Sequence, residues 1–308
     1  MAASLSSGGR WASAGEADDR GGPAAVRVEP YRWRLSGSFL AHLTKAAAKQ
    51  HHRALIPTLA QLIPKDGVVF DIGAHAGQYT KLFAIAAARG RIYAFEPGSY
   101  ARSILRTVVW LRGLANVTVL PLALGAAPGL TVMSLPVKRR ASFAFGLAHL
   151  GSPIDRWPAV AQELVSMTTI DTVSRSLGLA RLDFIKADVE GWELRLLHGA
   201  EKALRRFRPR LLIELAEDHL ARAGDRRVDA FGFLAQLGYN AYERSSDGVL
   251  VPVASPGDGD YWFIAADDPV TALLPGPGGA RQPSPRRVSD TNQPDQTSGR
   301  SKFVRARD

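Results

Sequence analysis

The stretch GVVFDIGAHAG, residues 67–77, constrains the fold more than any other part of the sequence. Its apolar residues run together without the polar alternation of a strand that faces water, which is typical of a strand buried on both faces. The run then meets an aspartate, Asp71, and a turn with two glycines, Gly73 and Gly77. Glycine lets the backbone take a positive φ or approach a ligand closely. We therefore expect a buried strand whose end faces a bound molecule.

Strands and helices alternate along the rest of the chain. Helical segments of 10 to 15 residues between strands favour crossover units and a mostly parallel sheet covered on both faces. The sequence thus predicts a doubly wound α/β fold with a seven-stranded sheet, whose last two strands form an antiparallel pair. The expected strands lie at 67–73, 91–97, 116–125, 183–191, 209–216, 239–243 and 261–267.

Three other segments complete this expectation. Single helices are expected over 36–63, which stops before Pro64, and over 192–207. The segment 126–167 has no regular pattern and is expected to be a long loop that covers the substrate, since long loops in compact domains tend to carry function. His51 and His52 are expected to be solvated on the first helix.

Composition sets the domain boundaries. With 308 residues, 46% hydrophobic and 22% charged, the chain suits one large globular domain. Residues 1–29 are rich in Gly, Ala and Ser, and residues 269–308 in Pro, Gly and basic residues, so both are expected to be disordered tails. Residues 30–268 are the expected folded domain.

The absence of cysteine limits the chemistry. No disulfide or thiolate metal site is possible, and a reducing compartment is the simplest expectation. No apolar run approaches the roughly 18 residues of a membrane helix, and the N-terminus lacks the pattern of a secretion signal. We expect a soluble cytoplasmic protein without membrane insertion.

The formal charge of +10 admits two interpretations. The basic residues either form a solvated surface or weakly attract an anionic substrate or partner. Part of the excess lies in the C-terminal tail, and RRFRPR at 205–210 closes a predicted helix, where cations interact favourably with the dipole. No nucleic-acid-binding module is legible, so no nucleic-acid partner is expected, and the oligomeric state is left open.

A second acidic residue follows the expected second strand. Glu96 lies 19 residues after Gly77, at the place where such folds hold the two hydroxyls of a ribose. The glycines are spaced G-x-x-x-G, so the G-x-G-x-x-G turn that binds a dinucleotide pyrophosphate is missing, which disfavours a nicotinamide oxidoreductase. A nucleoside without a pyrophosphate fits better, and the combination suggests S-adenosylmethionine.

Two further carboxylates end neighbouring central strands. Asp188 lies toward the end of the expected strand 183–191 and Glu214 lies in LLIEL, and adjacent strands are about 4.8 Å apart. The pair could therefore share a substrate hydroxyl or a divalent cation. Glu190 and Glu193 are either functional or simply favoured at a helix start, and His219 is either a base or a surface residue on a loop. Lys186 is a possible charge partner of Asp188.

Several of these pieces, in this order, resemble the FkbM family of S-adenosylmethionine-dependent methyltransferases. The resemblance covers roughly residues 66–265, and its most specific motif is DFIKADVEGWE. The matching pieces are FDIGAHAGQYT, FEP, LALG, TTIDTV, DFIKADVEGWE, LHGAEKAL and PRLLIEL. The family pattern has an asparagine where this chain has His75, and both residue types tolerate a left-handed backbone.

The resemblance implies a Rossmann-like class I methyltransferase fold that methylates a hydroxyl of a small molecule, such as a sugar or a secondary metabolite. By motif match, Asp71, Gly73 and Gly77 would line the methionine end of the cofactor, Glu96 would bind its ribose and Asp188 would lie at the reaction centre. His75 in the same turn, Pro97 of FEP and Ala123 of LALG are also expected to bind the cofactor. Glu214, on the neighbouring strand, is expected to be catalytic together with Asp188.

Two matters stay open at this point. A divalent metal held by Asp188 and Glu214 is compatible with the sequence but not required. A methyltransferase-like fold that serves as a non-catalytic binding or accessory protein is the alternative to an enzyme.

Overall fold

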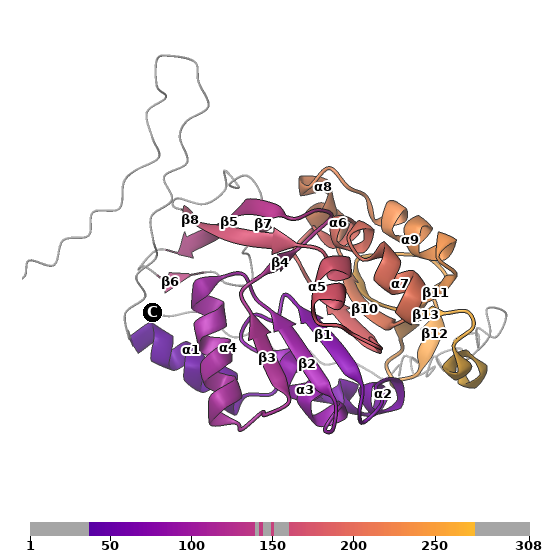
Figure 1. Ribbon diagram of the computed structural model, residues 1–308, viewed down its shortest axis with the longest axis horizontal. Coiled ribbons are helices and arrows are strands. Elements are labelled where there is room, and N and C mark those ends of the chain that lie inside the picture. The colour runs from indigo at the N-terminus through magenta and orange to yellow at the C-terminus, as the bar shows by residue number, and fades with distance from the viewer. Residues whose placement is uncertain (1–36, 139–141, 144–148, 151–159, 275–308) are drawn as a thin grey trace, which may run out of the picture.

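The computed structural model describes residues 37–138, 142–143, 149–150 and 160–274 (Figure 1). The expected tail 1–29 and most of the expected tail 269–308 lie outside these residues. A short 3₁₀ helix, η3 (Pro269–Leu273), follows the expected boundary at residue 268. Within the described ranges, no helix is both long enough and apolar enough to cross a membrane.

The main sheet has the expected doubly wound topology. Its strand order is β12-β11-β13-β10-β9-β1-β2-β3, and the pairs from β10 to β3 are parallel. The seven expected strands are all present, and the short β12 adds an eighth at the edge. The strands are β1 (Val68–Ile72), β2 (Arg91–Phe95), β3 (Val117–Leu120), β9 (Phe184–Ala187), β10 (Arg210–Leu215), β11 (Tyr239–Arg244), β12 (Leu250–Pro252) and β13 (Gly259–Ala265).

The order reverses between β1 and β9. The chain winds outward from β1 through β2 to β3, then returns to place β9 on the other side of β1. In open α/β sheets, ligands bind beyond the carboxyl ends of the strands at such a switch point. A ligand site is therefore expected at the carboxyl ends of β1, β2 and β9.

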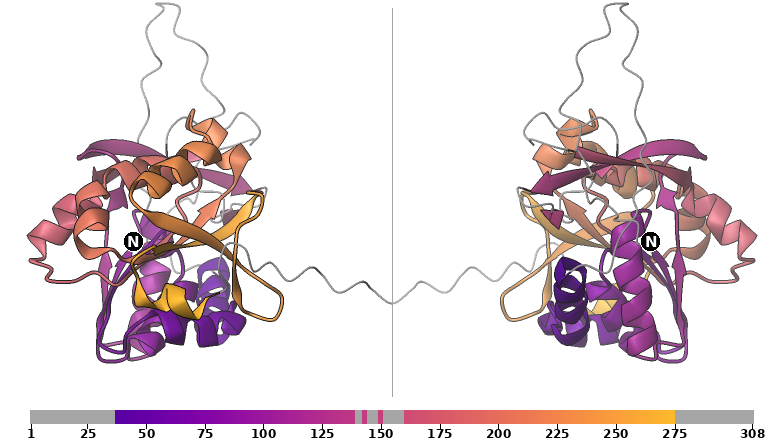
Figure 2. Two further views of the ribbon diagram at one scale, coloured as in Figure 1. Left: turned by 90° about the vertical axis from the view of Figure 1, so that its right-hand side faces the viewer. Right: turned by 90° about the vertical axis from the view of Figure 1, so that its left-hand side faces the viewer.

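Helices cover both faces of this sheet, as expected. One face carries α2 (Ile56–Leu62), α3 (Gln78–Ala86) and α4 (Ser99–Leu111), and the other carries α5 (Ile170–Ser176), α6 (Glu193–His198), α7 (Glu201–Phe207) and α9 (Arg227–Gln236). The indigo N-terminal helices and the orange α9 accordingly lie on opposite sides in Figure 2. Two large apolar clusters, one on each face, form the core.

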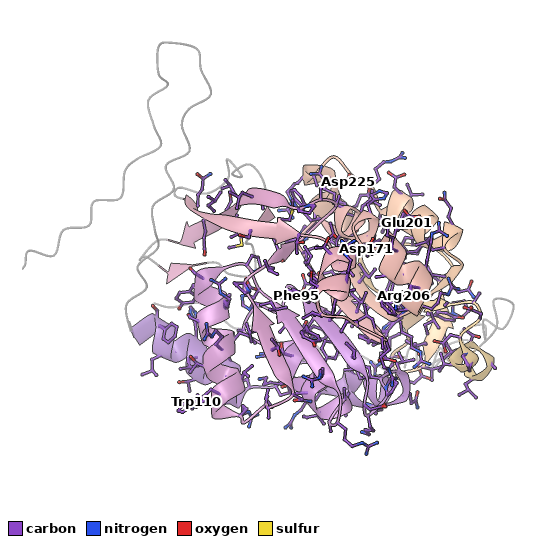
Figure 3. All side chains as sticks on the ribbon, viewed as in Figure 1. Phe95, Trp110, Asp171, Glu201, Arg206 and Asp225 are labelled. Atoms are coloured by element: carbon purple, nitrogen blue, oxygen red, sulfur yellow. The ribbon has the colours of Figure 1, made fainter. Side chains whose placement is uncertain are left out.

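The helix α4 shows how the apolar pattern sets this packing. Its inner side buries Ile104, Leu105 and Val108, whereas Trp110 on its outer side is 77% exposed. Figure 3 shows Trp110 at the outer edge of the molecule and Phe95, which is fully buried, near its centre. A single apolar stripe of this kind is typical of a helix that covers one face of a sheet.

The helix expected over 36–63 is broken. The structure has α1 (Gly37–Ala48), a 3₁₀ turn η1 (Arg53–Leu55) and then α2, with His52 in the left-handed region at φ 59°. The buried ammonium of Lys81 donates to the carbonyls of Ala46 and Lys49, at 2.6 and 2.8 Å. This side chain satisfies the last carbonyls of α1 in place of a further helical turn.

The helix expected over 192–207 is also divided, into α6 and α7. The break falls at Gly199, where a Cβ would lie 2.0 Å from the carbonyl oxygen of Gly125. The backbone just after β4 (Ala123–Leu124) therefore approaches too closely for a side chain, and the chain bends there.

The expectation of a long irregular loop over 126–167 is wrong for most of its length. Here β5 (Gly129–Lys138) and β8 (Val160–Thr168) form an antiparallel pair, joined by β4 (Ala123–Leu124), β6 (Ser142–Phe143) and β7 (His149–Leu150) in a second sheet (Figure 1, upper left). The strand expected over 116–125 is correspondingly split into β3 and β4. The remaining residues between β5 and β8 lie outside the described ranges.

Gly73 lets β1 and β9 end side by side. It has a φ of +72°, and a Cβ at this position would lie 1.8 Å from the carbonyl oxygen of Asp188. The first glycine of the turn is thus required by the protein's own backbone at the switch point. Gly178, after α5, has a φ of +60° but nothing within 4 Å of an added Cβ.

We expect Gly73→Ala to destabilise the fold more than Gly178→Ala does. Both changes impose a left-handed alanine, about 1–2 kcal/mol, but only the first adds a backbone clash, about 1–3 kcal/mol for overpacking. Urea denaturation of the two variants measures the difference. Equal losses of unfolding free energy would show that the β1 turn can move away from β9.

Candidate active site

A cavity of about 280 Å³ opens at the carboxyl ends of β1, β2 and β9, at the switch point. Its lining includes six of the residues predicted to be catalytic or to bind the cofactor. They are Gly73, His75, Glu96, Pro97, Ala123 and Asp188. The predicted ligand-facing edge of the sheet is therefore hollow.

Glu96 is fixed in the wall of this cavity. Its side chain accepts hydrogen bonds from the amides of His75 and Gly98, each at 2.8 Å, and it is 7% exposed. Burial raises the pKa of Glu96 to about 7, even though both amides oppose the shift. Each carboxylate oxygen keeps a further lone-pair site for a donor from a ligand.

His75 takes the backbone conformation that the motif requires. Its φ is 49°, in the left-handed region, so the turn forms with histidine as the sequence predicts. The ring borders the cavity, and the protein packed around it lowers the pKa of His75, mainly by desolvation.

Asp71 and Gly77 do not line the cavity. Asp71 is fully buried one layer below it, where one oxygen accepts from the hydroxyl of Thr80 at 2.5 Å and the other has no hydrogen-bond partner in the described structure. Burial raises the pKa of Asp71. Gly77 begins α3 with a φ of +84° and leaves no room for a Cβ beside Leu105. Both residues therefore support the turn from behind.

Lys186 places a positive charge in the lining of the cavity. It is 4% exposed, lies opposite Asp71 in the parallel register of β1 and β9, and donates to Asp188 at 2.9 Å. Its ammonium also lies 4.9 Å from the centre of the Tyr79 ring. Burial alone would lower the pKa of Lys186, but Asp188 and Asp71 outweigh it and raise the pKa. Lys186 is therefore the charge partner that the sequence suggests.

Asp188 and Glu214 are brought together as the sequence predicts. They follow paired positions of β9 and β10, and a hydrogen bond joins their carboxyl groups. Although burial raises the pKa of Asp188, Lys186 reverses the effect and lowers it, whereas burial and the charge of Asp188 raise the pKa of Glu214. Asp188 is thus the ionised member of the pair and Glu214 carries the shared proton.

Across the described ranges, no group of three or more His, Asp or Glu side chains is arranged to hold a metal ion. Glu214 itself does not line the cavity and is reached through Asp188.

The structure distinguishes the two glutamates that follow β9. Glu193 is buried and accepts from the amides of Val189 and Gly191, at 3.1 and 3.2 Å, so it stabilises the turn. Glu190, held at a φ of 56°, lines the cavity and pairs with His219 at 3.1 Å.

His219 itself lies on a helix, α8 (Glu217–Arg222), and not on a loop as expected. Gly191 allows this contact, because a Cβ there would lie 2.2 Å from the carbonyl oxygen of His219.

Several cavity residues were not predicted. His52 lies outside any helix and stacks on Tyr79, with ring centres 4.6 Å apart, and both rings line the cavity. Gln78 positions this segment by accepting two hydrogen bonds: its backbone carbonyl accepts from the side-chain amide of Gln50 at 3.0 Å, and its side-chain oxygen accepts from the backbone amide of His51 at 3.1 Å. No local pattern marks His52, but Tyr79, the second residue of the helix that follows the glycines, could have been found from its position.

We expect Lys186→Met to cost about 3–5 kcal/mol at neutral pH, because it leaves buried carboxylates without their cation. The pKa values of Asp71 and Asp188 would then lie above their unfolded values, so the folded state would bind more protons and the loss would shrink as the pH falls. Urea denaturation at about pH 7 and pH 5 measures both effects. The control is Lys202→Met, at an exposed lysine of α7, expected to stay within about 0.5 kcal/mol. A loss that does not vary with pH would contradict the assignment.

Comparison with known proteins places this geometry in a family. A sequence model of the methyltransferase FkbM domain matches residues 71–241, which is more than half of the chain and spans β1, β2, β9 and β10. None of the curated proteins compared matches the chain.

Solved structures with a similar fold are distant. An FkbM methyltransferase from Methylobacillus flagellatus KT is 15% identical with a TM-score of 0.42, over 73% of this chain and 58% of its own. The chain thus spans less than two thirds of that protein's length. A putative O-methyltransferase from Klebsiella pneumoniae is 14% identical with a TM-score of 0.39, over 74% of this chain and 89% of its own.

A putative methyltransferase from Streptococcus mutans, solved with SAH, is 12% identical with a TM-score of 0.40, over 70% of this chain and 96% of its own. The assignment rests on the domain match, which covers the glycine turn, Glu96 and the strand-end carboxylates. The chain belongs to the FkbM family of methyltransferases.

Proposed function

We propose that this protein transfers the methyl group of S-adenosylmethionine to a hydroxyl group of a small molecule. The observation that carries the proposal is that Glu96 and Asp188, the two carboxylates needed at opposite ends of such a donor, line one cavity at the switch point. The reaction type agrees with the family, and the donor and acceptor are our inference.

The cavity suits the nucleoside of this donor. Glu96 is held by two backbone amides with lone pairs to spare, so it can accept from both ribose hydroxyls. Leu122, Ala123 and Met133 supply an apolar wall for adenine. Pro97 follows Glu96 in the same wall, as the sequence predicts.

The other end of the cavity suits the reaction. Methyl transfer is an in-line displacement. A bond forms between the acceptor oxygen and the methyl carbon while the carbon–sulfur bond breaks, and its electron pair stays on sulfur. The donor supplies an activated methyl group on a positively charged sulfur, and positioning accounts for much of the rate. Asp188, ionised beside Lys186, would orient the acceptor hydroxyl.

The proton of the hydroxyl goes to the carboxyl pair. Asp188 faces the cavity and is hydrogen-bonded to Glu214, whose pKa is raised. When the surroundings give two neighbouring carboxyl groups different pKa values, the group with the lower pKa stays ionised and the group with the higher pKa exchanges the proton. Glu214 can take the proton only after it has lost the one it holds, so activity should rise with pH above neutrality. No metal enters this scheme, although Asp188 and Glu214 were candidates for one.

Replacing Glu96 tests the donor site. We expect Glu96→Gln to weaken the binding of S-adenosylmethionine about tenfold or more, since one charge-assisted hydrogen bond is worth about 1.5–3 kcal/mol. Because ribose hydroxyls favour the ionised form of Glu96, whose pKa is about 7 in the free protein, the wild-type affinity should rise between about pH 6 and pH 8. Isothermal calorimetry measures both effects.

Glu163→Gln is the matched control for this test. Glu163 caps α4 by accepting from the amide of Ser99, at 3.0 and 3.1 Å, close to the cavity but outside its lining. Its replacement should leave the affinity at about pH 8 unchanged. Because the charge of Glu163 contributes to the raised pKa of Glu96, the rise of affinity with pH should persist and move only toward lower pH. An equal affinity of Glu96→Gln and wild type would refute the ribose assignment.

Replacing Glu214 tests the chemistry. We expect Glu214→Gln to lower the rate of methyl transfer about 10²- to 10⁴-fold, the usual contribution of a general base, with donor affinity unchanged. Glutamine keeps the hydrogen bond to Asp188 but cannot accept a proton. The assay uses donor with a radiolabelled methyl group and fractionated small molecules from the source cells.

Two outcomes would count against this scheme. An unchanged rate in Glu214→Gln would remove Glu214 from the mechanism. Donor binding by the wild-type protein without any labelled product would favour the alternative of a non-catalytic binding protein.

A further inference from the structure

Charge is distributed unevenly between the two halves of the main sheet. From residue 72 to residue 154 the only acidic residue of the sequence is Glu96, which is buried in the cavity wall. This stretch includes β2, β3, α3 and α4. In the other half, arginines are paired with carboxylates, as in Arg195–Asp225 at 3.2 Å and Arg210–Asp268 at 2.8 Å. Positive charge is therefore balanced on one side of the fold and left unbalanced on the other.

Basic side chains gather at the amino ends of β1 and β2, the edge of the sheet opposite the cavity. The amide of Arg89 donates to the carbonyl of Lys65 at 2.7 Å, and the amide of Arg91 donates to the carbonyl of Gly67 at 3.0 Å. The segments that lead into the two strands are therefore in contact. The side chains of Lys65, Arg89 and Arg91 are all exposed.

The end of α4 continues this surface. In the turn between α4 and β3, the carbonyl of Asn116 accepts from the amide of Ile92 at 2.9 Å, and its side chain donates to the carbonyl of Ala87 at 2.9 Å. The turn thus lies against the start of β2 and the end of α3. It begins with Arg112, which is exposed. We call the four side chains the basic edge: Lys65, Arg89, Arg91 and Arg112.

The carboxylates that precede β1 and β9 at this edge already have a partner. Asp66, next to Lys65, forms an ion pair with Arg181 at 3.1 Å, and Asp183 pairs with the same guanidinium at 2.7 Å. Within the described part of the chain, no ion pair joins the basic edge to a carboxylate. Its positive charge therefore faces solvent and can attract an anionic partner.

Two large apolar side chains adjoin the basic edge. At the end of α4, Trp110 is 77% exposed and Leu111 is 53% exposed, and the exposed Arg106 lies one turn before Trp110. Figure 3 shows Trp110 near the lower edge of the molecule, away from Phe95, which ends β2 and lines the cavity. Tryptophan and leucine flanked by arginine are typical of a surface that lies at the boundary between water and lipid.

This combination selects one kind of anionic partner. A second copy of the chain would present the same positive charge and be repelled. A nucleic acid offers phosphates to the arginines and bases to Trp110, but no apolar environment to Leu111. An anionic bilayer offers charged headgroups to the basic edge and an apolar boundary to both Trp110 and Leu111.

We infer that the basic edge, together with Trp110 and Leu111, docks the protein on an anionic lipid surface. The contact is peripheral and reaches only the boundary of the bilayer. Because the cavity opens at the opposite ends of the strands, it stays turned toward water while the protein is docked. The inference does not rest on the proposed function.

Sedimentation of the full chain with lipid vesicles tests the inference. We expect binding to vesicles made of equal parts of phosphatidylcholine and phosphatidylserine, and none to vesicles of phosphatidylcholine alone. Binding should be strong at about 0.1 M salt and lost at about 1 M, because salt screens exposed charges. Equal binding to both kinds of vesicle, or binding to neither, would overturn the inference.

A double variant locates the contact. Arg89→Gln with Arg91→Gln should weaken vesicle binding about 25-fold, since each basic side chain near an anionic surface contributes about fivefold. The control is Arg175→Gln with Arg206→Gln, which removes the same charge from exposed positions of α5 and α7 on the other face of the sheet. The control should change binding less than about twofold. Equal effects would show that the overall charge or a tail binds the vesicles, and would contradict the inference.

A second variant leaves β2 intact. Arg112→Gln, in the turn after α4, should weaken vesicle binding about fivefold. Every substituted arginine is exposed, so urea denaturation should give the wild-type free energy of unfolding within about 0.5 kcal/mol. Unchanged vesicle binding by Arg112→Gln and by the double variant would overturn the inference.

Replacing Trp110 separates lipid from other anionic partners. Trp110→Ala should weaken vesicle binding about three- to tenfold, for the loss of part of the buried apolar surface. The control is Leu130→Ala, at a side chain of β5 that is 68% exposed and remote from the basic edge in sequence, and it should have no effect. Displacement of the protein from vesicles by polyuridylate, with unchanged vesicle affinity of Trp110→Ala, would assign the basic edge to nucleic acid instead.

Discussion

The buried ammonium of Lys186 is the interaction on which the site depends. It lies between Asp71 at the end of β1 and Asp188 at the end of β9, the two strands between which the sheet reverses its order. Without this cation, the carboxylates of Asp71 and Asp188 would be two like charges held close together where little water reaches them. With it, Asp188 stays ionised, and the extra proton of the cluster falls on Glu214.

The same residues explain why the side chains of Lys186 and Glu214 lie on one face of the sheet. Side chains alternate along a strand, so Lys186 shares a face with Phe184, and Glu214 with Leu212. Phe184 and Leu212 belong to the apolar cluster beneath α2 and α3. Lys186 and Glu214 thus lie two residues beyond Phe184 and Leu212 on the same face of the sheet. They are nearer the carboxyl ends of the strands, where α3 begins.

Much of this arrangement could be predicted from the sequence. Unbroken apolar runs identify buried strands, and their order along the chain predicts that Asp71, Glu96 and Asp188 end neighbouring strands. Pairing of Asp188 with Glu214 follows from adjacency alone. The left-handed backbone at His75 also follows, because the turn geometry depends on the backbone more than on the side chain.

The features that the sequence did not predict have a common physical cause. The break after α1 depends on Lys81, more than 30 residues away, and the break between α6 and α7 depends on the backbone of Gly125. Neither contact leaves a trace in the local pattern. In the same way, Asp71 looked like a ligand contact because the sequence gives the strand end but not the depth, and Thr80 covers it.

Gly73 is required in the turn for a different reason from the one that the sequence suggests. Gly73 was expected to make room for a ligand, yet its missing side chain makes room first for the carbonyl of Asp188. Close contact between the β1 turn and the end of β9 brings the cavity wall and Asp188 within one ligand's reach. A motif that lets two strands of the protein touch thereby also fixes how far Asp188 lies from Glu96 in the lining of one cavity, which explains why both carboxylates lie at the switch point.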